Sequence, residues 1–518
     1  MSKYNNKTIA LGLDGATWDI LFPLIEEGKL PTLKKLMNEG VYGDLQSVIP
    51  PVTCPAWKCY STGKNPGKLG VFWWVNLNKE NGKIVAPNAH SFKSRDLWDY
   101  LGERGFKVGI INMPTTYPVK PVNGFMIAGF GAPMDKMFDF QQPYTYPKEL
   151  QEELESKYDY RVGIENLNRE KKKKLVKDIC RLIKTRFQLT KDKLDEGKWD
   201  FIHMTIFYIN SLQHFYGKDK VVEDAWRLID ANIRELMDNG YNIIIFSDHG
   251  SMDIKGSFVI NKWLIEEGYL KLKKDFGDVL SKIDDIAIKI FKRERRYFAY
   301  IMRKIIPSSI LEKFPGIYGS IPTNMIDQKI DWENSDAMAL SQGPIYINEK
   351  KVGKRYHQLR EELIEKLGDI KDPRTGEKVI SKCYRKEEIY TGPYMKDAPD
   401  IVLLPSEGYE IYGGIDKDIF QSKRVSWTTG NHPKGIFLAF GSEIKEGEKI
   451  NGARIIDIAP TILHIFGVPI PKDMDGRVLK EIFKSNSEFA KKPIIYQEVG
   501  EKERVKDRIK ELKKLGKI

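Results

Sequence analysis

Cysteine is scarce in this chain. Its 518 residues contain four cysteines, Cys54, Cys59, Cys180 and Cys383, and no two of them have C-x-x-C spacing. Their number and spacing argue against a disulfide framework and against a zinc site made of thiolates. A metal ion held by this chain would therefore need oxygen and imidazole ligands.

Long apolar runs are also lacking. No segment approaches the roughly 18 consecutive apolar residues that cross a bilayer, so the sequence predicts no integral membrane protein. A short polar lead passes directly into an apolar stretch that ends at Asp14, without the longer apolar region and cleavage site of a secretory signal. We therefore expect a cytoplasmic protein. The basic and aromatic stretch at 289–306 leaves peripheral membrane contact open.

Positive charge is in excess but is not concentrated. The net charge is +12, yet Lys and Arg are interspersed with Asp and Glu along most of the chain. A basic balance attracts nucleic acid, anionic lipid or phosphorylated molecules. No readable nucleic-acid motif accompanies the charge, so we expect no nucleic-acid partner. The oligomeric state does not follow from the sequence.

Apolar runs of strand length alternate with segments of helical period. The first strand is expected at 8–13, and a helix follows at 32–39 with Thr32 as its N-cap. Further strands are expected at 200–207 and 242–247, each preceded by a helical segment. This alternation predicts an α/β fold with a mostly parallel central sheet and helices on both faces.

The texture of the sequence changes along the chain and divides it into four parts. Residues 1–255 are expected to form the first part of the core, and 256–330 an inserted basic helical region. This region is a possible lid over the site. Residues 331–485 form the second part of the core with a small α/β subregion, and 486–518 form a charged C-terminal extension.

Polar residues of metal-binding type stand beside four predicted strands. They are Asp14 after the first strand, Asn210 and His214 after the strand at 204–209, Asp248 and His249 after the strand at 242–247, and His432 just before the strand at 435–440. Each is ordinary alone. Three of the seven histidines of the chain occupy such positions, however, and a parallel sheet would bring all these residues to the edge where ligands bind.

Several motifs occur in an order that is specific to one family. They are "LGLDGA", "VTCPAWKCYSTGKNPGKLGV", "NSLQH", "SDHG", "GNHPKG" and the late "IDIAPTILHIFGVPIPKDMDGRVL". With these motifs the chain resembles the type I phosphodiesterase/nucleotide pyrophosphatase family of the alkaline phosphatase superfamily. The resemblance implies an alkaline-phosphatase-like core with an inserted cap region, and it implies that Thr53 is the nucleophile.

The same resemblance implies two divalent metal ions, with zinc favoured and manganese open. Asp14, Thr53, Asp248 and His249 would hold one ion, and Asn210, His214 and His432 would hold the other. A divalent cation lowers the pKa of a threonine hydroxyl, which is otherwise a poor nucleophile, so that it can attack phosphorus. A phosphothreonine would form and then be hydrolysed.

The implied function is hydrolysis of a small-molecule phosphate ester, either a diester or a monoester. Asn210 stands where the family usually has an Asp ligand, so the second site lacks one negative charge. This leaves open a catalytically weakened metal-binding member, and a phosphotransferase of the same fold is a second alternative.

The segment around Thr53 raises two smaller questions. Lys58 and Lys64 either supply a cation to the substrate or are solvated loop lysines, which is the favoured interpretation. Cys54 suggests a sulfatase, but Pro55 follows it directly and the C-x-P-x-R context is missing. We therefore expect Cys54 to be a small buried neighbour of Thr53.

Overall fold

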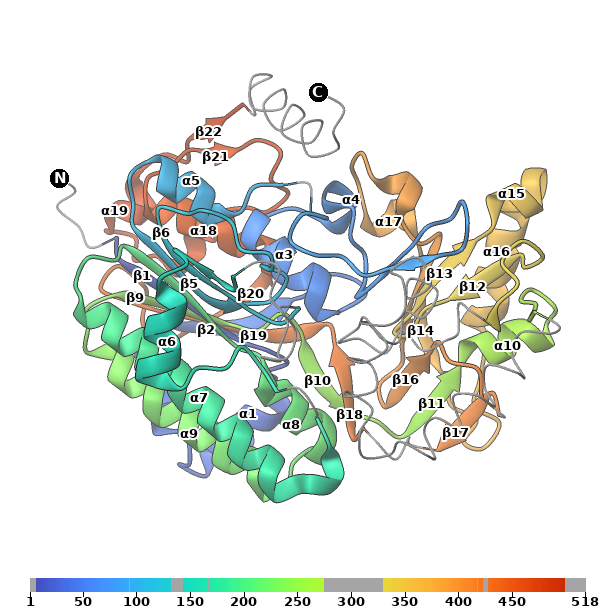
Figure 1. The fold of residues 1–518 in the computed structure, drawn as a ribbon, viewed down its shortest axis with the longest axis horizontal. Coiled ribbons are helices and arrows are strands. Elements are labelled where there is room, and N and C mark those ends of the chain that lie inside the picture. The colour runs from blue at the N-terminus through green and yellow to red at the C-terminus, as the bar shows by residue number, and fades with distance from the viewer. Residues whose placement is uncertain are drawn as a thin grey trace, which may run out of the picture.

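The computed structural model of the protein describes residues 6–92, 94–131, 143–164, 167–273, 329–416, 418–422 and 427–498. Figure 1 shows a large α/β unit and a smaller unit beside it. The basic stretch at 289–306 and most of the expected C-terminal extension, 499–518, lie outside the described residues. Among the residues that are described, no helix has the length and apolar character needed to cross a membrane.

In the described part of the chain, nine strands form the sheet of the large unit, in the order β20-β2-β19-β9-β1-β8-β5-β6-β7. Taken in that order they span Glu448–Arg454, Val41–Gln46, Lys434–Phe440, Asn242–Phe246, Thr8–Leu13, Phe201–Ile206, Val108–Met113, Gly124–Ala128 and Thr145–Tyr146. Strands β19 and β7 run antiparallel to their neighbours, and the remaining neighbours pair in parallel. The prediction of a mostly parallel sheet is confirmed.

Helices cover both faces of this sheet (Figure 1). On one face lie α1 (Trp18–Glu26), α2 (Pro31–Glu39), α6 (Leu150–Tyr158), α7 (Lys172–Asp195), α8 (Tyr208–Tyr216) and α9 (Lys220–Met237). The other face carries α3 (Thr53–Thr62), α5 (Leu97–Glu103) and α18 (Ile458–Ile465). Every residue of β1 is buried, as expected for a strand covered on both faces.

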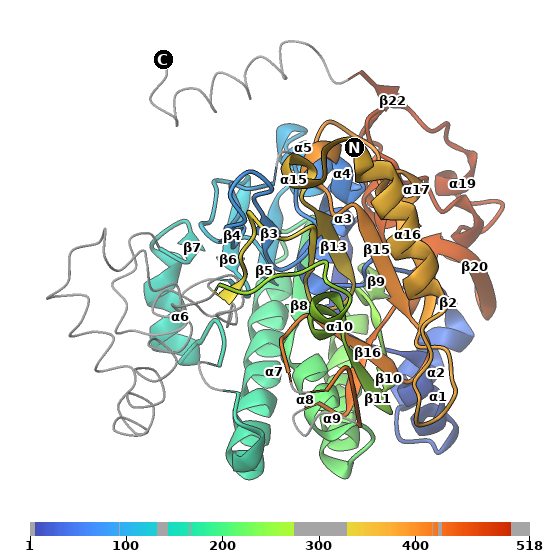
Figure 2. The ribbon, with the colours of Figure 1, turned by 90° about the vertical axis from the view of Figure 1, so that its right-hand side faces the viewer.

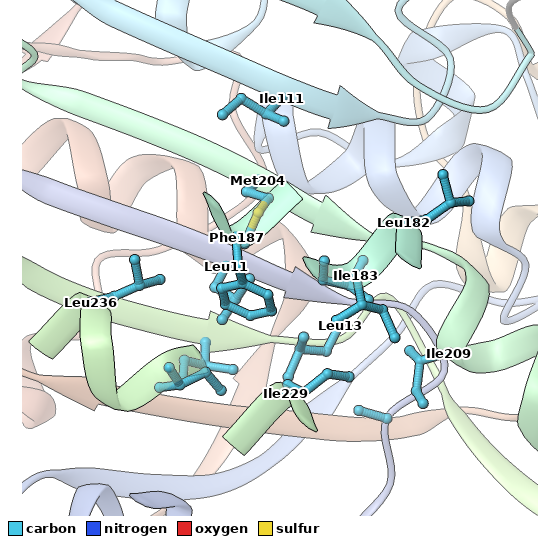
Figure 3. Packing of buried hydrophobic residues seen from close by; sticks show 14 of the residues in the cluster. Leu11, Leu13, Ile111, Leu182, Ile183, Phe187, Met204, Ile209, Ile229 and Leu236 are labelled. Atoms are coloured by element: carbon cyan, nitrogen blue, oxygen red, sulfur yellow. The ribbon is translucent and has the colours of Figure 1, made fainter. Parts of the chain in front are cut away.

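A single buried cluster joins the sheet to α7 and α9. It includes Leu11 and Leu13 of β1, Met204 of β8, Ile183 and Phe187 of α7, and Ile229 of α9 (Figure 3). These helical residues recur at the spacing of one face of a helix, which explains why the sequence pattern indicated their burial.

The start of α2 differs from the prediction. The helix begins at Pro31, and Thr32 does not cap it. Instead, the carboxylate of Asp230 in α9 accepts hydrogen bonds from the backbone N–H groups of Thr32 (3.1 Å) and Leu33 (2.8 Å). A carboxylate from a neighbouring helix thus satisfies the N–H groups that a helix start leaves free.

The smaller unit is inserted between β10 (Gly250–Asp253) and β18 (Thr429–His432). Its strands are β11 (Gly256–Val259), β12 (Ala337–Ala339), β13 (Pro344–Ile347), β14 (Ile380–Arg385), β15 (Ile401–Pro405), β16 (Tyr409–Tyr412) and β17 (Phe420–Ser422). Its described helices are α10 (Ile260–Glu266), α15 (Glu349–Val352), α16 (Tyr356–Gly368) and α17 (Lys386–Ile389). Figure 2 turns this unit towards the viewer and shows α10 and α16 against its strands.

Short elements complete the description. They are α4 (Pro66–Leu69), β3 (Asn76–Leu77), β4 (Ile84–Val85), α19 (Glu488–Lys491), β21 (Ile470–Pro471) and β22 (Tyr496–Gln497), with 3-10 turns at Arg169–Lys171, Gly353–Arg355, Met395–Asp397, Ile455–Asp457 and Lys480–Ile482. Strands β10 and β18 pair as an antiparallel ribbon, so the chain leaves and re-enters the large unit beside the carboxyl end of β9.

Candidate active site

Two neighbouring parallel strands bring three ligand-type residues together. Asp14 follows β1, and Asp248 and His249 follow β9, which pairs with β1. Nε2 of His249 lies 3.9 Å from Oδ1 of Asp14 and 3.3 Å from Oδ2 of Asp248. All three side chains are fully buried. One ligand atom from each lies within 4.8 Å of the others, so the three residues could hold one metal ion.

The two carboxylates are only half satisfied by the protein. Oδ2 of Asp14 accepts a hydrogen bond from Nε1 of Trp57 (3.0 Å), and Oδ1 of Asp248 accepts one from the backbone N–H of Gly15 (3.1 Å). Oδ1 of Asp14 and Oδ2 of Asp248 are buried and have no hydrogen-bond partner. Burial and then repulsion from Asp248 raise the pKa of Asp14. Two buried oxygens that lack donors fit a divalent cation.

The ring of His249 is oriented as a metal ligand or hydrogen-bond acceptor. Its Nδ1–H donates to the carbonyl of Gly250 (2.9 Å), which leaves the lone pair of Nε2 directed into the cluster. Oγ1 of Thr53 lies 3.2 Å from that nitrogen. The structure thus brings Thr53 to Asp14, Asp248 and His249, the four residues that the resemblance assigned to one ion.

Thr53 is buried at the first position of α3, a helix of ten residues. Pro50 and Pro51 precede it, and because proline has no N–H the chain cannot continue there as a regular strand. The hydroxyl therefore stands at the N-terminus of a helix, where the helix dipole favours an anion.

Asn210 and His214 lie one helical turn apart in α8, which begins after β8. Oδ1 of Asn210 is buried without a hydrogen-bond partner. It lies so close to Gly15, the residue after Asp14, that a Cβ at that glycine would stand 2.2 Å from it. Asn210 therefore reaches the edge of the cluster with an oxygen that a cation would satisfy.

His214 is held in the same ring tautomer as His249. Its Nδ1–H donates to the carbonyl of Thr429 (2.7 Å), which leaves the lone pair of Nε2 for a ligand. Burial lowers the pKa of His214 to about 4, so the ring is neutral near pH 7. Trp427 stacks on it with 4.1 Å between ring centroids.

His432 is oriented differently. It pairs with Gly250 across the β10–β18 ribbon, one residue from His249. Its Nδ1 accepts the backbone N–H of Lys434 (3.2 Å), so Nε2 carries the proton of the neutral ring. Among the residues that the structure describes, the Asp and His group with ligand atoms within 4.8 Å contains neither His214 nor His432.

The interpretation of Lys58 and Lys64 as solvated lysines is wrong. Both are buried, and Lys58 pairs with Asp96 (2.5 Å) while Lys64 pairs with Asp473 (2.6 Å). The charge of each lysine is therefore paired with a carboxylate of the fold. Cys54 is buried as expected, and burial raises the pKa of its thiol to about 12, which makes it unreactive.

Trp57 is a residue of the site that the sequence motifs did not single out. It follows Thr53 by four residues and therefore shares a face of α3 with it. Its indole N–H fixes one oxygen of Asp14, and its ring fills the space left by Gly12 of β1, where a Cβ would stand 2.2 Å from the ring.

Comparison with known proteins identifies relatives of the chain. A sequence model of the type I phosphodiesterase / nucleotide pyrophosphatase family matches residues 8–433. Phosphonoacetate hydrolase from Sinorhizobium meliloti 1021, in complex with phosphonoformate, superposes with a TM-score of 0.53 at 13% identity, over 89% of this chain and 95% of that chain. Human ectonucleotide pyrophosphatase/phosphodiesterase 5 superposes with a TM-score of 0.51 at 13% identity, over 93% and 100% of the two chains. No curated protein sequence matches the chain.

The structural likenesses confirm the alkaline-phosphatase-like α/β fold, and at this low identity they show the fold alone. Together with the family match, the fold and site define a phosphoester hydrolase. More narrowly, the chain belongs to the type I phosphodiesterase/nucleotide pyrophosphatase family, which is metal-dependent. The buried Asp14–Asp248–His249 cluster is its candidate metal centre.

Proposed function

We propose that this protein hydrolyses a small-molecule phosphate ester with Thr53 as its nucleophile and two divalent metal ions, zinc or manganese, as its cofactors. The observation that carries the proposal is the position of Oγ1 of Thr53, 3.2 Å from Nε2 of His249, beside two carboxylate oxygens that have no partner. A cation held by Asp14, Asp248 and His249 supplies, when bound, the charge that lowers the pKa of the hydroxyl and stabilises the phosphoryl oxygens.

The chain's own residues account for the remaining chemistry. Thr53 loses its hydroxyl proton to solvent, and Oγ1 then forms a bond to phosphorus while the bond from phosphorus to the leaving oxygen breaks. The leaving oxygen takes a proton from water. Water next attacks the phosphothreonine, the bond between phosphorus and Oγ1 breaks, and Thr53 recovers a proton. The N-terminus of α3 faces the phosphoryl oxygens throughout.

Asn210, His214 and His432 form the second metal site in this proposal, and it binds its ion more weakly than the first. Asn210 contributes no charge, and an amide oxygen is a poorer zinc ligand than a carboxylate. For Nε2 of His432 to bind an ion, its proton must also move to Nδ1, which would break the hydrogen bond that Nδ1 accepts from the N–H of Lys434. Anomalous scattering from zinc- or manganese-loaded crystals would show how many ions bind and where.

The role of Thr53 is tested with p-nitrophenyl phosphate and bis-p-nitrophenyl phosphate in zinc or manganese. Thr53→Ala should lower kcat by at least about 1,000-fold, and acid-quenched wild-type enzyme should carry phosphate on Thr53 by mass spectrometry. Thr375→Ala, an exposed threonine of the smaller unit, serves as the control with normal turnover. Full turnover by Thr53→Ala would overturn the proposal.

A phosphotransferase differs from a hydrolase in the acceptor of the second step. Adding an alcohol to the same assay distinguishes them, because transfer to the alcohol in preference to water would replace hydrolysis as the function. We place the enzyme in the cytoplasm, a proposal supported by four free cysteines. Cell fractionation with an antibody tests this location.

A further inference from the structure

The loop that leads to the nucleophile cannot hold itself in place. This segment, residues 47–52, is called here the nucleophile loop. Pro50 and Pro51 have no N–H groups to donate, and Val52 makes a backbone hydrogen bond to the carbonyl of Pro50 (2.9 Å). The carbonyls of Ile49 and Pro51 therefore need donors from elsewhere in the fold if the loop is to keep one conformation.

The start of the loop is attached to the metal-binding edge of the large sheet. The backbone N–H of Ser47 donates to the carbonyl of Pro433 (2.8 Å), and its hydroxyl donates to the carbonyl of Asp248 (2.5 Å). These contacts are six residues from Thr53, too far along the chain to fix the direction of its hydroxyl.

Tyr390 holds the middle of the loop from the smaller unit. Its phenol hydroxyl donates to the carbonyl of Ile49 (2.7 Å). The ring is 2% exposed and packs against Phe72, with 5.1 Å between ring centroids. Because the ring is buried in the small cluster that also contains Val402 of β15, the smaller unit places this donor firmly.

Asn431 holds the end of the loop from β18. Its Nδ2 donates to the carbonyl of Pro51 (2.8 Å), two residues before Thr53. Its Oδ1 is buried and has no partner among the described residues. A buried carbonyl oxygen without a donor costs stability, so the gain in stability from this side chain is small. Its amide donates its hydrogen bond to the nucleophile loop.

We propose that Tyr390 and Asn431 are positioning residues that together fix the direction in which Thr53 presents its hydroxyl. This inference rests on the proposed role of Thr53 as nucleophile. The position of the loop determines the position of the start of α3, because the N–H of Ala56 donates to the carbonyl of Val52 (3.0 Å) and closes the first turn of the helix. Removing the hydrogen bond from either side chain lets the loop shift and moves Oγ1 of Thr53 out of line with the breaking bond.

Two variants remove one donor each. Tyr390→Phe deletes a hydroxyl, and Asn431→Leu deletes the amide while keeping similar volume. With enzyme in excess over p-nitrophenyl phosphate, the single-turnover rate constant for p-nitrophenol release should fall about 10- to 100-fold in each variant. KM and the metal content measured by mass spectrometry should stay at the wild-type values, because neither residue is among the proposed metal ligands.

Matched controls come from the opposite edge of the sheet. The hydroxyl of Tyr241 donates to the carbonyl of Trp199 (2.6 Å), and Nδ2 of Asn123 donates to the carbonyl of Phe106 (2.9 Å). Tyr241→Phe and Asn123→Leu therefore remove the same kind of donor far from Thr53, and Asn123→Leu also removes the bond that Oδ1 of Asn123 accepts from Nζ of Lys107 (2.8 Å). These variants should keep the wild-type rate constant even where their melting temperature falls.

The outcomes separate the inference from the proposed function. If Thr53→Ala is inactive while Tyr390→Phe and Asn431→Leu keep the wild-type rate constant, the inference is overturned and the proposed function stands. Rate losses that match those of Tyr241→Phe and Asn123→Leu, or that follow lost metal, also overturn it. Full turnover by Thr53→Ala overturns the proposed function itself.

Discussion

At the scale of single residues, the candidate centre is marked by oxygen atoms that lack donors. Oδ1 of Asp14, Oδ2 of Asp248 and Oδ1 of Asn210 are all buried without a hydrogen-bond partner. Buried carboxylates in this condition are costly, and burial raises the pKa of both Asp14 and Asp248. A fold that gathers such atoms is stabilised by whatever cation satisfies them.

In the proposed two-metal site, Asn210 is the residue whose charge sets the affinity for the second ion. Asn210→Asp adds a negative charge beside Asp14, so binding of the second zinc or manganese ion should tighten on the order of 10-fold. In EDTA the same variant should melt at a lower temperature than the wild type, because three buried carboxylates then repel one another. Calorimetric titration measures the first effect and thermal unfolding with and without metal measures the second.

The metal-free measurement is the internal control for that variant. An Asn210→Asp protein with unchanged affinity for both ions and unchanged melting in EDTA would show that residue 210 lies outside the metal site.

At the scale of elements, α3 carries Thr53, the proposed nucleophile, and is fixed by a buried ion-pair network. Nζ of Lys58 in α3 lies 2.5 Å from Oδ1 of Asp96, whose Oδ2 lies 2.7 Å from Nζ of Lys120. Burial opposes ionisation of Asp96, yet Lys120 and Lys58 lower its pKa well below its usual range. Asp96 is also the N-cap residue of α5, so its ion pair with Lys58 connects two helices on the same face of the sheet.

Removing the charge of Asp96 should destabilise the whole unit. Asp96→Asn leaves the ammonium of Lys58 buried beside a neutral amide, and the expected loss is about 3–5 kcal/mol in the free energy of unfolding. Denaturant titration measures this loss.

Two further variants test the cause. Lys58→Met combined with Asp96→Asn should recover part of the stability, because the unpaired charge is gone. Glu235→Gln, which breaks an exposed pair with Lys191, should cost less than about 1 kcal/mol. A loss in Asp96→Asn no larger than that of Glu235→Gln would contradict the argument.

At the scale of the whole molecule, the sheet buries a neutral histidine. His203 of β8 is fully buried, with Nδ1 3.0 Å from the hydroxyl of Tyr60 and Nε2 2.7 Å from Oγ1 of Thr205. Burial lowers its pKa to about 3. Between the ordinary pKa of about 6.5 and that value, the unfolded chain binds a proton that the folded chain does not.

Stability should therefore fall as the pH falls from about 6.5 towards 3, by up to about 1.4 kcal/mol per pH unit from this residue. In His203→Gln, which can still hydrogen-bond to Tyr60 and Thr205, the decline should be shallower. Urea unfolding in EDTA at several pH values measures both slopes.

His357→Gln, an exposed residue of α16, provides the comparison and should keep the wild-type slope. Parallel curves for the wild type and His203→Gln would show that His203 does not set the acid sensitivity.

Local patterns in the sequence indicated most of the elements and the residue types of the site, although the strand expected at 204–209 ends at Ile206 and α8 begins at Tyr208. The uniformly apolar β1 and β9, the helical spacing of residues such as Ile183 and Phe187, and the polar residues after the strands reflect short-range physics that a sequence displays directly. The family resemblance grouped Thr53 with Asp14, Asp248 and His249, and the four lie together in the structure, the last three at the ends of two neighbouring parallel strands.

Such local patterns could not predict contacts between residues that are far apart in the sequence. Four features of the structure join residues from separate elements. They are the hydrogen bonds from α2 to Asp230, the buried ion pairs of Lys58 and Lys64, the hydrogen bond from Trp57 to Asp14, and the hydrogen bonds from Tyr390 and Asn431 to the nucleophile loop. The sequence by itself determined which segments become strands and helices and which residue types can bind a cation. Only the tertiary structure decided which charges are buried and paired, because burial depends on what packs against each side chain.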